Sequence, residues 1–368
     1  MRGAAAVLSA RELNRATLAR QMLLERAEDL AVPAAVQRLA GMQAQEPKHP
    51  FVGLWSRTER FSPDALLGAL ADRSVVRATL MRSTLHLFSA ADYVALRRAL
   101  QPPTSAALRV LGRRAEGLDP DAVVVATRRL LADRPLTFDA IRAGLQEHFP
   151  DVDERALGYA ARTLVPLVMV PDAAARWGYP RICEFALAEK FLGRAPAPAA
   201  PEALVERYLG AFGPASAVDV QTWSGLAGAK RVLEGMRDRL ALFADERGRD
   251  LFDLVDAPRP GADAPAPVRY LPEFDNLVLA YDDRTRVIAS EHRPLVTTKN
   301  LRVKATFLVD GVVAGIWTLA VKRGVATLTL APFVSLPKRV VKALGEEGEA
   351  LARFAEPAAK EHAVVVAG

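Results

Sequence analysis

Two glutamines separated by a single residue, Gln43 and Gln45, lie in the segment LAGMQAQEPKHPF at residues 39–51. The residues at 33–43 have the three- and four-residue apolar spacing that predicts a helix. Pro47 disfavours helical geometry just beyond, so the pair falls at the helix end or in the following loop. Residues two apart share no face of a helix, whereas in an extended segment they point the same way. We therefore expect the two amides to converge on one target.

The chemistry open to two amides is limited. A glutamine does not titrate near neutral pH, so it cannot act as an ordinary general base. Its carbonyl oxygen can orient a water molecule, and its NH₂ group can donate hydrogen bonds. Such a pair suffices for hydrolysis only where the leaving group is already activated. The alternative interpretation is that both side chains are solvated or bond the last carbonyls of the helix.

A second group of candidates lies in RATLMRSTLHLFS at residues 77–89. Arg77, Arg82 and His86 fall in or beside the predicted strands of a hairpin, where they would face phosphates from a wing. The alternative is an exposed strand face on which the arginine stems cover apolar surface.

A third group lies in the segment 284–304, which carries six basic residues against Glu291 alone. Such a run is commonly a solvated face, but its sign and density equally predict a contact with a nucleic-acid backbone. The candidates for DNA contact here are Arg293, Lys299, Arg302 and Lys304. Just before this segment, LPEFDNLVL contains an Asp-Asn pair that favours a turn.

The composition narrows the classes of partner and compartment. The 368 residues carry a formal net charge of +6 and are 51% hydrophobic, a globular composition that suits a polyanionic partner. A GC-rich genome, which favours arginine and alanine, would produce the same charge.

The chain has no run of 18 apolar residues, so no membrane span is expected. The single cysteine, Cys183, fits a reducing cytoplasm, and histidines without HExxH or CxxC spacing predict no metal site. We expect a cytoplasmic monomer without a cofactor or a membrane contact.

The elements that must position these candidates recur in one order. Ser9 and Glu12 form a capping box that opens a helix to about Leu30, and Ser62-Pro63 starts a helix that follows the one at 33–43. Strands within 75–88 complete three helices and a hairpin, the order of a winged helix. The order returns in helices at 136–149 and 151–166 with strands in 167–187, and again in helices at 201–212, 216–226 and 227–240 with a hairpin in 241–254.

Proline- and alanine-rich stretches at 194–201 and 256–268 are typical of linkers. After the second, strands are predicted from 285–290 onward, with turns at Asp310-Gly311 and Arg323-Gly324, then a helix at 338–356 and a short last strand. The sequence thus predicts an α+β fold. Its units are winged helices at 1–115, 116–195 and 196–260, and a small β-rich domain at 261–368.

Four segments resemble a known family. GMQAQEP, LMRSTLHLFSAADY, GPASAVDVQTWSGL and LPEFDNLVL are similar to the winged-helix DNA glycosylases typified by AlkZ and YcaQ, and the first resembles the QxQ motif of the AlkZ branch. The resemblance implies three tandem winged helices plus a β-barrel-like domain, C-shaped around duplex DNA. It also implies excision of N7-alkylguanine adducts, unhooking of azinomycin-type interstrand crosslinks and a role in genotoxin resistance. The catalytic pair of the family maps to Gln43 and Gln45.

This implied activity accounts for a pair of neutral amides. Alkylation at N7 makes guanine cationic, so its glycosidic bond breaks readily toward an oxocarbenium-like sugar. The protein then needs to place a water and stabilise charge rather than supply a strong acid. Lys48 is the only lysine near the pair, so we expect monofunctional hydrolysis without a Schiff base. A crosslinked guanine stays tied to the other strand, which makes ordinary base flipping a poor model.

Two other functions remain open from the sequence. A non-enzymatic winged-helix regulator would bind specific sites, usually as a dimer. A resistance protein that sequesters a drug or its adduct would show no turnover.

Overall fold

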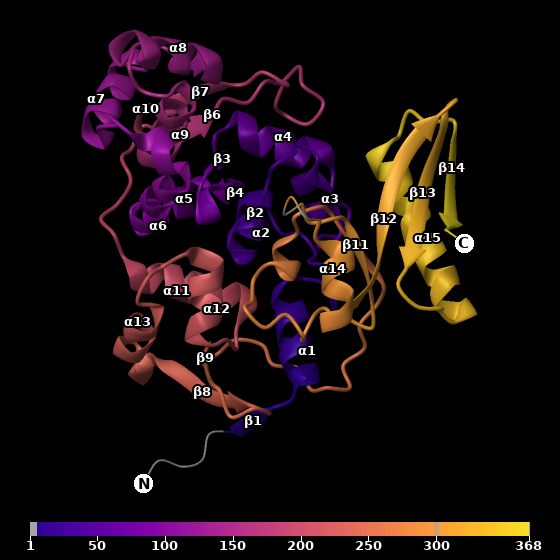
Figure 1. The fold of residues 1–368 in the computed structure, drawn as a ribbon. Coiled ribbons are helices and arrows are strands. Elements are labelled where there is room, and N and C mark those ends of the chain that lie inside the picture. Colours follow the sequence, from indigo (N-terminus) through magenta and orange to yellow (C-terminus); the bar gives the residue numbers. More distant parts are fainter. Residues whose placement is uncertain (1–5, 299, 301, 368) are drawn as a thin grey trace.

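Three β-sheets flanked by helices build the molecule (Figure 1). The computed structural model describes residues 6–298, 300 and 302–367. Over these residues the chain has the mixed α+β fold that the sequence predicts. None of the helices described is both long and apolar enough to cross a bilayer.

The six-stranded sheet positions the glutamines. In spatial order its strands are β2 (Met42–Gln43), β4 (Leu85–Ser89), β3 (Val75–Thr79), β6 (Leu167–Met169), β7 (Glu184–Leu187) and β5 (Leu136–Thr137). Helices near these strands in the chain are α2 (Val32–Arg38), α3 (His49–Trp55), α4 (Pro63–Ala71), α5 (Ala90–Leu96), α6 (Gln101–Ala106), α7 (Pro120–Leu130), α8 (Phe138–His148), α9 (Glu154–Leu164) and α10 (Ala188–Leu192). The antiparallel pairs β3–β4 and β6–β7 confirm both predicted sets of strands. One bridge, Ala78 to Val168, joins the first two predicted units in a single sheet.

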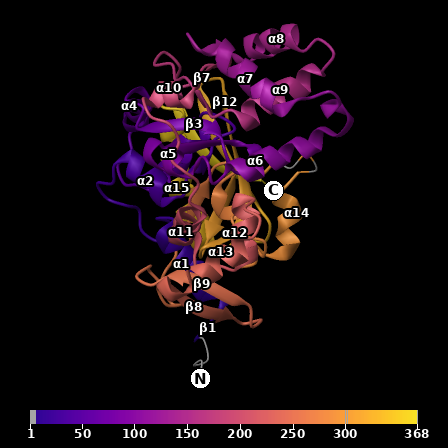
Figure 2. The same ribbon diagram turned by 90° about the vertical axis from the view of Figure 1, so that its left-hand side faces the viewer.

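The three-stranded sheet lies at the opposite end of the molecule from α7, α8 and α9 (Figures 1 and 2). It contains β1 (Ala6–Leu8), β8 (Leu240–Asp245) and β9 (Asp250–Leu254). In the chain, β8 follows the helices α11 (Pro201–Phe212), α12 (Ala217–Ser224) and α13 (Ala229–Gly235). The β8–β9 hairpin is the one predicted. However, β1 pairs in parallel with β8, so the first predicted unit contributes a strand to the third. The four unit boundaries therefore stay predictions.

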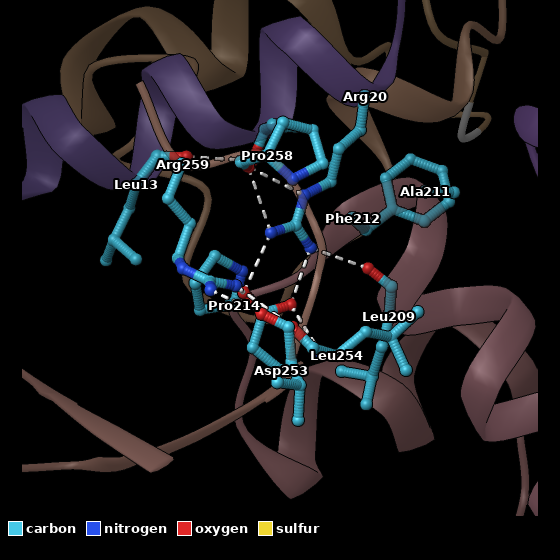
Figure 3. A network of polar contacts seen from close by, with 12 residues as sticks. Leu13, Arg20, Leu209, Ala211, Phe212, Pro214, Asp253, Leu254, Pro258 and Arg259 are labelled. Atoms are coloured by element: carbon cyan, nitrogen blue, oxygen red, sulfur yellow. Dashed lines mark hydrogen bonds and ion pairs between the residues drawn. The ribbon is translucent and has the colours of Figure 1, made fainter. Parts of the chain in front are cut away.

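A buried ion pair ties α1 (Ala10–Arg20) to this sheet (Figure 3). The guanidinium of Arg20 donates to both carboxylate oxygens of Asp253 on β9, over 2.7 and 2.8 Å. It also donates to the carbonyl of Leu209 on α11, and Arg259 donates to the same carboxylate. Because the side chains of Arg20 and Asp253 are almost completely buried, this network fixes where α1 packs.

The C-terminal sheet is open. Its order is β10 (Arg269–Leu271), β11 (Thr306–Val309), β12 (Val312–Lys322), β13 (Val325–Pro332) and β14 (Glu361–Val366), and α15 (Lys338–Ala355) packs against it. Both predicted turns are confirmed, with Asp310-Gly311 and Arg323-Gly324 in left-handed conformation. The predicted strand at 285–290 is wrong, since these residues form turns. The barrel implied by the resemblance is not shown: over the described residues this sheet runs from β10 to β14, and these two outer strands do not pair with each other.

Helix boundaries near the glutamines also differ from prediction. The Ser9–Glu12 capping box is confirmed, but α1 ends at Arg20 rather than near Leu30, and Met22 just beyond has a positive φ. The helix predicted at 33–43 ends at Arg38. The helix α3 was not predicted, because prolines in this segment indicate a break. In the structure a proline occupies the first turn of α3 instead of breaking it.

Candidate active site

Gln43 lies on a short strand rather than at a helix end. The left-handed residues Ala40 (φ +54°) and Gly41 (φ +81°) turn the chain after α2 into β2. A Cβ at position 41 would lie 2.0 Å from the Phe88 ring, so only glycine fits this approach. β2 then pairs antiparallel with β4, which sets Gln43 opposite His86.

The extended backbone brings the two amides to one cavity, as the two-residue spacing predicts. Gln43 and Gln45 both line an open cavity of about 630 Å³ between β2, the β3–β4 connection and residues 273–303. Gln43 is 7% exposed and Gln45 is half-buried. The backbone N–H of Leu85 donates to Gln45 Oε1 over 3.3 Å.

Arg77 holds the backbone of the pair from inside the protein. Its Nε donates to the carbonyl of Ala44 over 2.8 Å, and Nη2 donates to that of Gln45 over 2.9 Å. The guanidinium also lies over the ring of Tyr179. Arg77 is 4% exposed, so the expectation that it projects from an exposed wing is wrong. Its position shapes the glutamine segment instead.

His86 is also buried rather than exposed. Nδ1 donates to the Thr84 carbonyl over 3.0 Å, and within the described residues Nε2 has no hydrogen-bond partner. Burial and the nearby Arg82 lower the pKa of His86 to about 3. The imidazole is therefore neutral at physiological pH and cannot serve as a cationic phosphate contact, which corrects the expected role.

Arg82 reaches the cavity but is engaged with the protein. It lies in the 3₁₀ turn η1 (Met81–Ser83) with a left-handed backbone. Nη2 donates to Gln43 Oε1 over 2.9 Å, and Nη1 donates to the carbonyl of Trp223 over 3.0 Å. Burial and the neighbouring Arg284 lower the pKa of Arg82 to about 10, so it remains charged at neutral pH.

The basic segment supplies the opposite wall of the cavity. Arg293 is exposed and Arg284 half-buried, and both line the cavity. Burial and the charge of Arg293 lower the pKa of Arg284. Among the ion pairs of the described chain, none involves Arg82, Arg284 or Arg293. Because Arg82 is already bonded to Gln43 and Trp223, the charges available to attract an anion are those of Arg284 and Arg293. Arg284 is one of the six basic residues of the segment 284–304, but it was not among the predicted DNA contacts.

The other residues predicted to contact DNA differ in whether their charges are already engaged within the protein. Arg302 is exposed, and its guanidinium forms a two-bond pair with Glu273, which balances its charge. Lys304 is half-buried and donates to the carbonyl of Leu295. Lys299 lies outside the described residues.

The Asp-Asn pair of LPEFDNLVL has a larger role than a turn alone. Asp275 caps the turn at Leu277 and forms a buried ion pair with Arg57 over 2.8 Å. Asn276 Nδ2 donates to the carbonyl of Gly41 over 3.1 Å, which anchors this loop to the glutamine segment. In the sequence, the apolar residues on either side of the Asp-Asn pair were the signal that could have predicted its burial.

Metal ligands do not gather here. No group of three histidine, cysteine, aspartate or glutamate side chains suited to a metal occurs in the part of the chain described.

Comparisons with known proteins agree with one another. A family model described as DNA glycosylase AlkZ-like matches residues 36–354. The chain is 28% identical over 348 residues to an interstrand DNA cross-link repair glycosylase of Streptomyces sahachiroi, which covers 86% of this chain and 89% of that protein. The solved structure of the S. sahachiroi DNA glycosylase AlkZ is similar with a TM-score of 0.81 at 23% identity, over 98% of this chain and 100% of that one.

Proposed function

Because this chain belongs to the AlkZ-like DNA glycosylase family, we propose that it hydrolyses the N-glycosidic bond of N7-alkylguanine in double-stranded DNA. The observation that carries the proposal is the convergence of Gln43 and Gln45 on one open cavity whose walls hold three arginines without carboxylate partners among the described residues. Amides supply hydrogen bonds to a water, and Arg284 and Arg293 attract the phosphates beside the lesion.

The reaction needs little from these side chains beyond position and charge. Departure of the alkylated base breaks the bond from C1′ to N9, whose electron pair neutralises the cationic ring. A water held by the glutamines adds to C1′ and releases its proton to solvent, which leaves an abasic site. Lys48, the lysine next to the glutamine pair in the sequence, is not among the residues that line the cavity, which supports monofunctional hydrolysis over a Schiff-base step.

The proposed binding mode uses three winged helices in a C-shaped arrangement around the duplex. The antiparallel pairs β3–β4, β6–β7 and β8–β9, each preceded by helices, support the winged-helix assignment. We include interstrand crosslinks of the azinomycin type among the substrates, and genotoxin self-resistance as the role. An open cavity supports this extension, because a guanine tied to both strands need not be swung out of the helix.

The test is single-turnover release of 7-methylguanine, and unhooking of a crosslinked duplex, by wild type and by the Gln43→Ala/Gln45→Ala variant. We expect wild-type release that is lost in the variant while its affinity for DNA persists. Gln37→Ala is the matched control, because the Gln37 amide on α2 donates to Asp92 on α5 and lines no part of this cavity. DNA binding without release by wild type would instead favour the regulator or the sequestering protein.

A further inference from the structure

We infer that Arg82 is a positioning residue that orients the amide of Gln43, so that Gln43 presents its NH₂ group as a donor. The rate effects of this inference rest on the proposed glycosylase activity, but the orientation itself does not. The donor chemistry of the two partners carries the first step. A guanidinium has five N–H donors and no acceptor, so the Gln43 atom 2.9 Å from Arg82 Nη2 has to be the carbonyl oxygen Oε1.

Arg82 is itself held by segments distant in the sequence. Its Nη1 donates to the carbonyl of Trp223 near the end of α12, and Nη2 lies 3.5 Å from Asn276 Oδ1. Asn276 in turn donates to the carbonyl of Gly41, two residues before Gln43. The planar fork of arginine can reach the Trp223 carbonyl and Gln43 together, whereas the single ammonium of lysine cannot hold the same geometry.

The second glutamine is oriented by the same logic. Gln45 Oε1 accepts from the backbone N–H of Leu85, and a backbone N–H is a donor only. Each amide therefore has one carbonyl lone pair already engaged by a protein donor. The NH₂ groups of both residues remain to bind acceptors. One of them can hold the attacking water through one lone pair of its oxygen, which leaves the second lone pair to form the bond to C1′.

A direct phosphate contact is the competing role for Arg82. That role would require Arg82 to exchange its bonds to Gln43 and Trp223 for bonds to DNA. Arg284 and Arg293 line the same cavity without acidic partners in the described chain, so they can bind phosphate without disturbing the glutamines.

A double-mutant cycle separates these roles. In Arg82→Lys, which keeps the charge, we expect single-turnover release to fall by about 10- to 100-fold, the loss typical of one hydrogen bond to a charged group. The affinity for DNA and its salt dependence should stay unchanged. In the Gln43→Ala background the same substitution should change release less than about twofold, because Arg82 then has no amide to orient. Arg353→Lys, which makes the same substitution in an ion pair with Glu349 on α15 away from the cavity, is the matched control.

Independent effects of the two substitutions would overturn the inference. So would a drop of about one in the salt slope of binding by Arg82→Met, which removes the charge, because that drop is the signature of a lost phosphate contact. A second measurement needs no activity. The ¹⁵N side-chain NH₂ resonances of Gln43, identified by their absence from Gln43→Ala, should shift in Arg82→Lys but not in Arg353→Lys. Unmoved resonances would refute the orientation of Gln43 by Arg82, whether or not the wild type releases a base. Absence of base release by the wild type would refute the proposed function, independently of the resonances.

Discussion

His86 lies directly opposite Gln43 in the β2–β4 pair, completely buried and neutral. Its pKa is lowered to about 3 from an ordinary value of about 6.5. Between these pH values the unfolded chain binds a proton that the folded chain does not. The free energy of unfolding should therefore rise with pH through this window and fall on acidification.

The measurement is urea unfolding of wild type and His86→Leu between pH 4.5 and about 8. The variant should show a shallower dependence of unfolding free energy on pH, whatever its absolute stability. Some dependence will remain, because burial also lowers the pKa of His49 to about 3. An identical slope in both proteins would contradict the burial argument for His86.

The buried pair of Arg20 and Asp253 gives a prediction about stability. Asp253→Ala leaves the Arg20 guanidinium without its carboxylate inside the protein, so we expect a loss of about 3–5 kcal/mol in unfolding free energy. Glu206→Ala is the control, because it removes the partner of Arg239 from an exposed pair and should cost at most about 1 kcal/mol. Equal losses in chemical denaturation would show that burial does not set the difference.

Arg284 and Arg293 should contribute to DNA affinity without regard to sequence. Arg284→Ala and Arg293→Ala are each expected to weaken binding and to lower the slope of log affinity against log salt by about 0.9. Fluorescence anisotropy with an undamaged duplex at several salt concentrations measures both effects. Arg353→Ala removes the same charge from an ion pair with Glu349 on α15 and should leave the slope unchanged. If all three variants behave alike, net charge rather than this cavity governs binding.

Gly41 should be required for the position of the glutamines. Gly41→Ala places a Cβ against Phe88 and strains a left-handed backbone, so we expect a loss of at least about 1 kcal/mol in stability and slower base release. Gly345→Ala on α15 meets no atom within 4 Å, and there alanine should stabilise by about 0.5–1 kcal/mol. Thermal melts and single-turnover release measure the two properties separately. Normal release by a folded Gly41→Ala protein would argue against this role.

Most helices and hairpins were predictable, because capping residues and turn residues act on the backbone within a few positions of the chain. Ser9 and Glu12 form the expected capping box, and the hairpin turn at Arg323-Gly324 follows from its own residues. The helix end before Gln43 was misplaced because Ala40, a strong helix former, adopts a positive φ. Ala40 takes the left-handed position of a helix end that is closed by a bond from the Gly41 N–H to the Val36 carbonyl over 2.9 Å, and β2 then pairs with β4.

The candidate site was predictable in its central pair but not in its surroundings. The spacing of Gln43 and Gln45 is a local property and gave the shared direction of their side chains. Whether Arg77 faces solvent depends on Tyr179, about a hundred residues away in the sequence. Likewise, the bond of Arg82 to the Trp223 carbonyl joins residues 141 positions apart. Such contacts leave no periodic signal in a single sequence.

The pairing of β1 with β8 has a consequence for synthesis on the ribosome. Residues 6–8 cannot form their strand until residues 243–245 have been made. At about 5–20 residues per second, that interval lasts roughly 10–50 s. During that time α1 can reach α11 through the bond of Arg20 to the Leu209 carbonyl, but it lacks both β8 and the buried pair of Arg20 with Asp253 that fix its position, while the six-stranded sheet can already assemble. Release of a nascent chain that stops before residue 240 should therefore yield a protein whose first twenty residues are readily cleaved by protease.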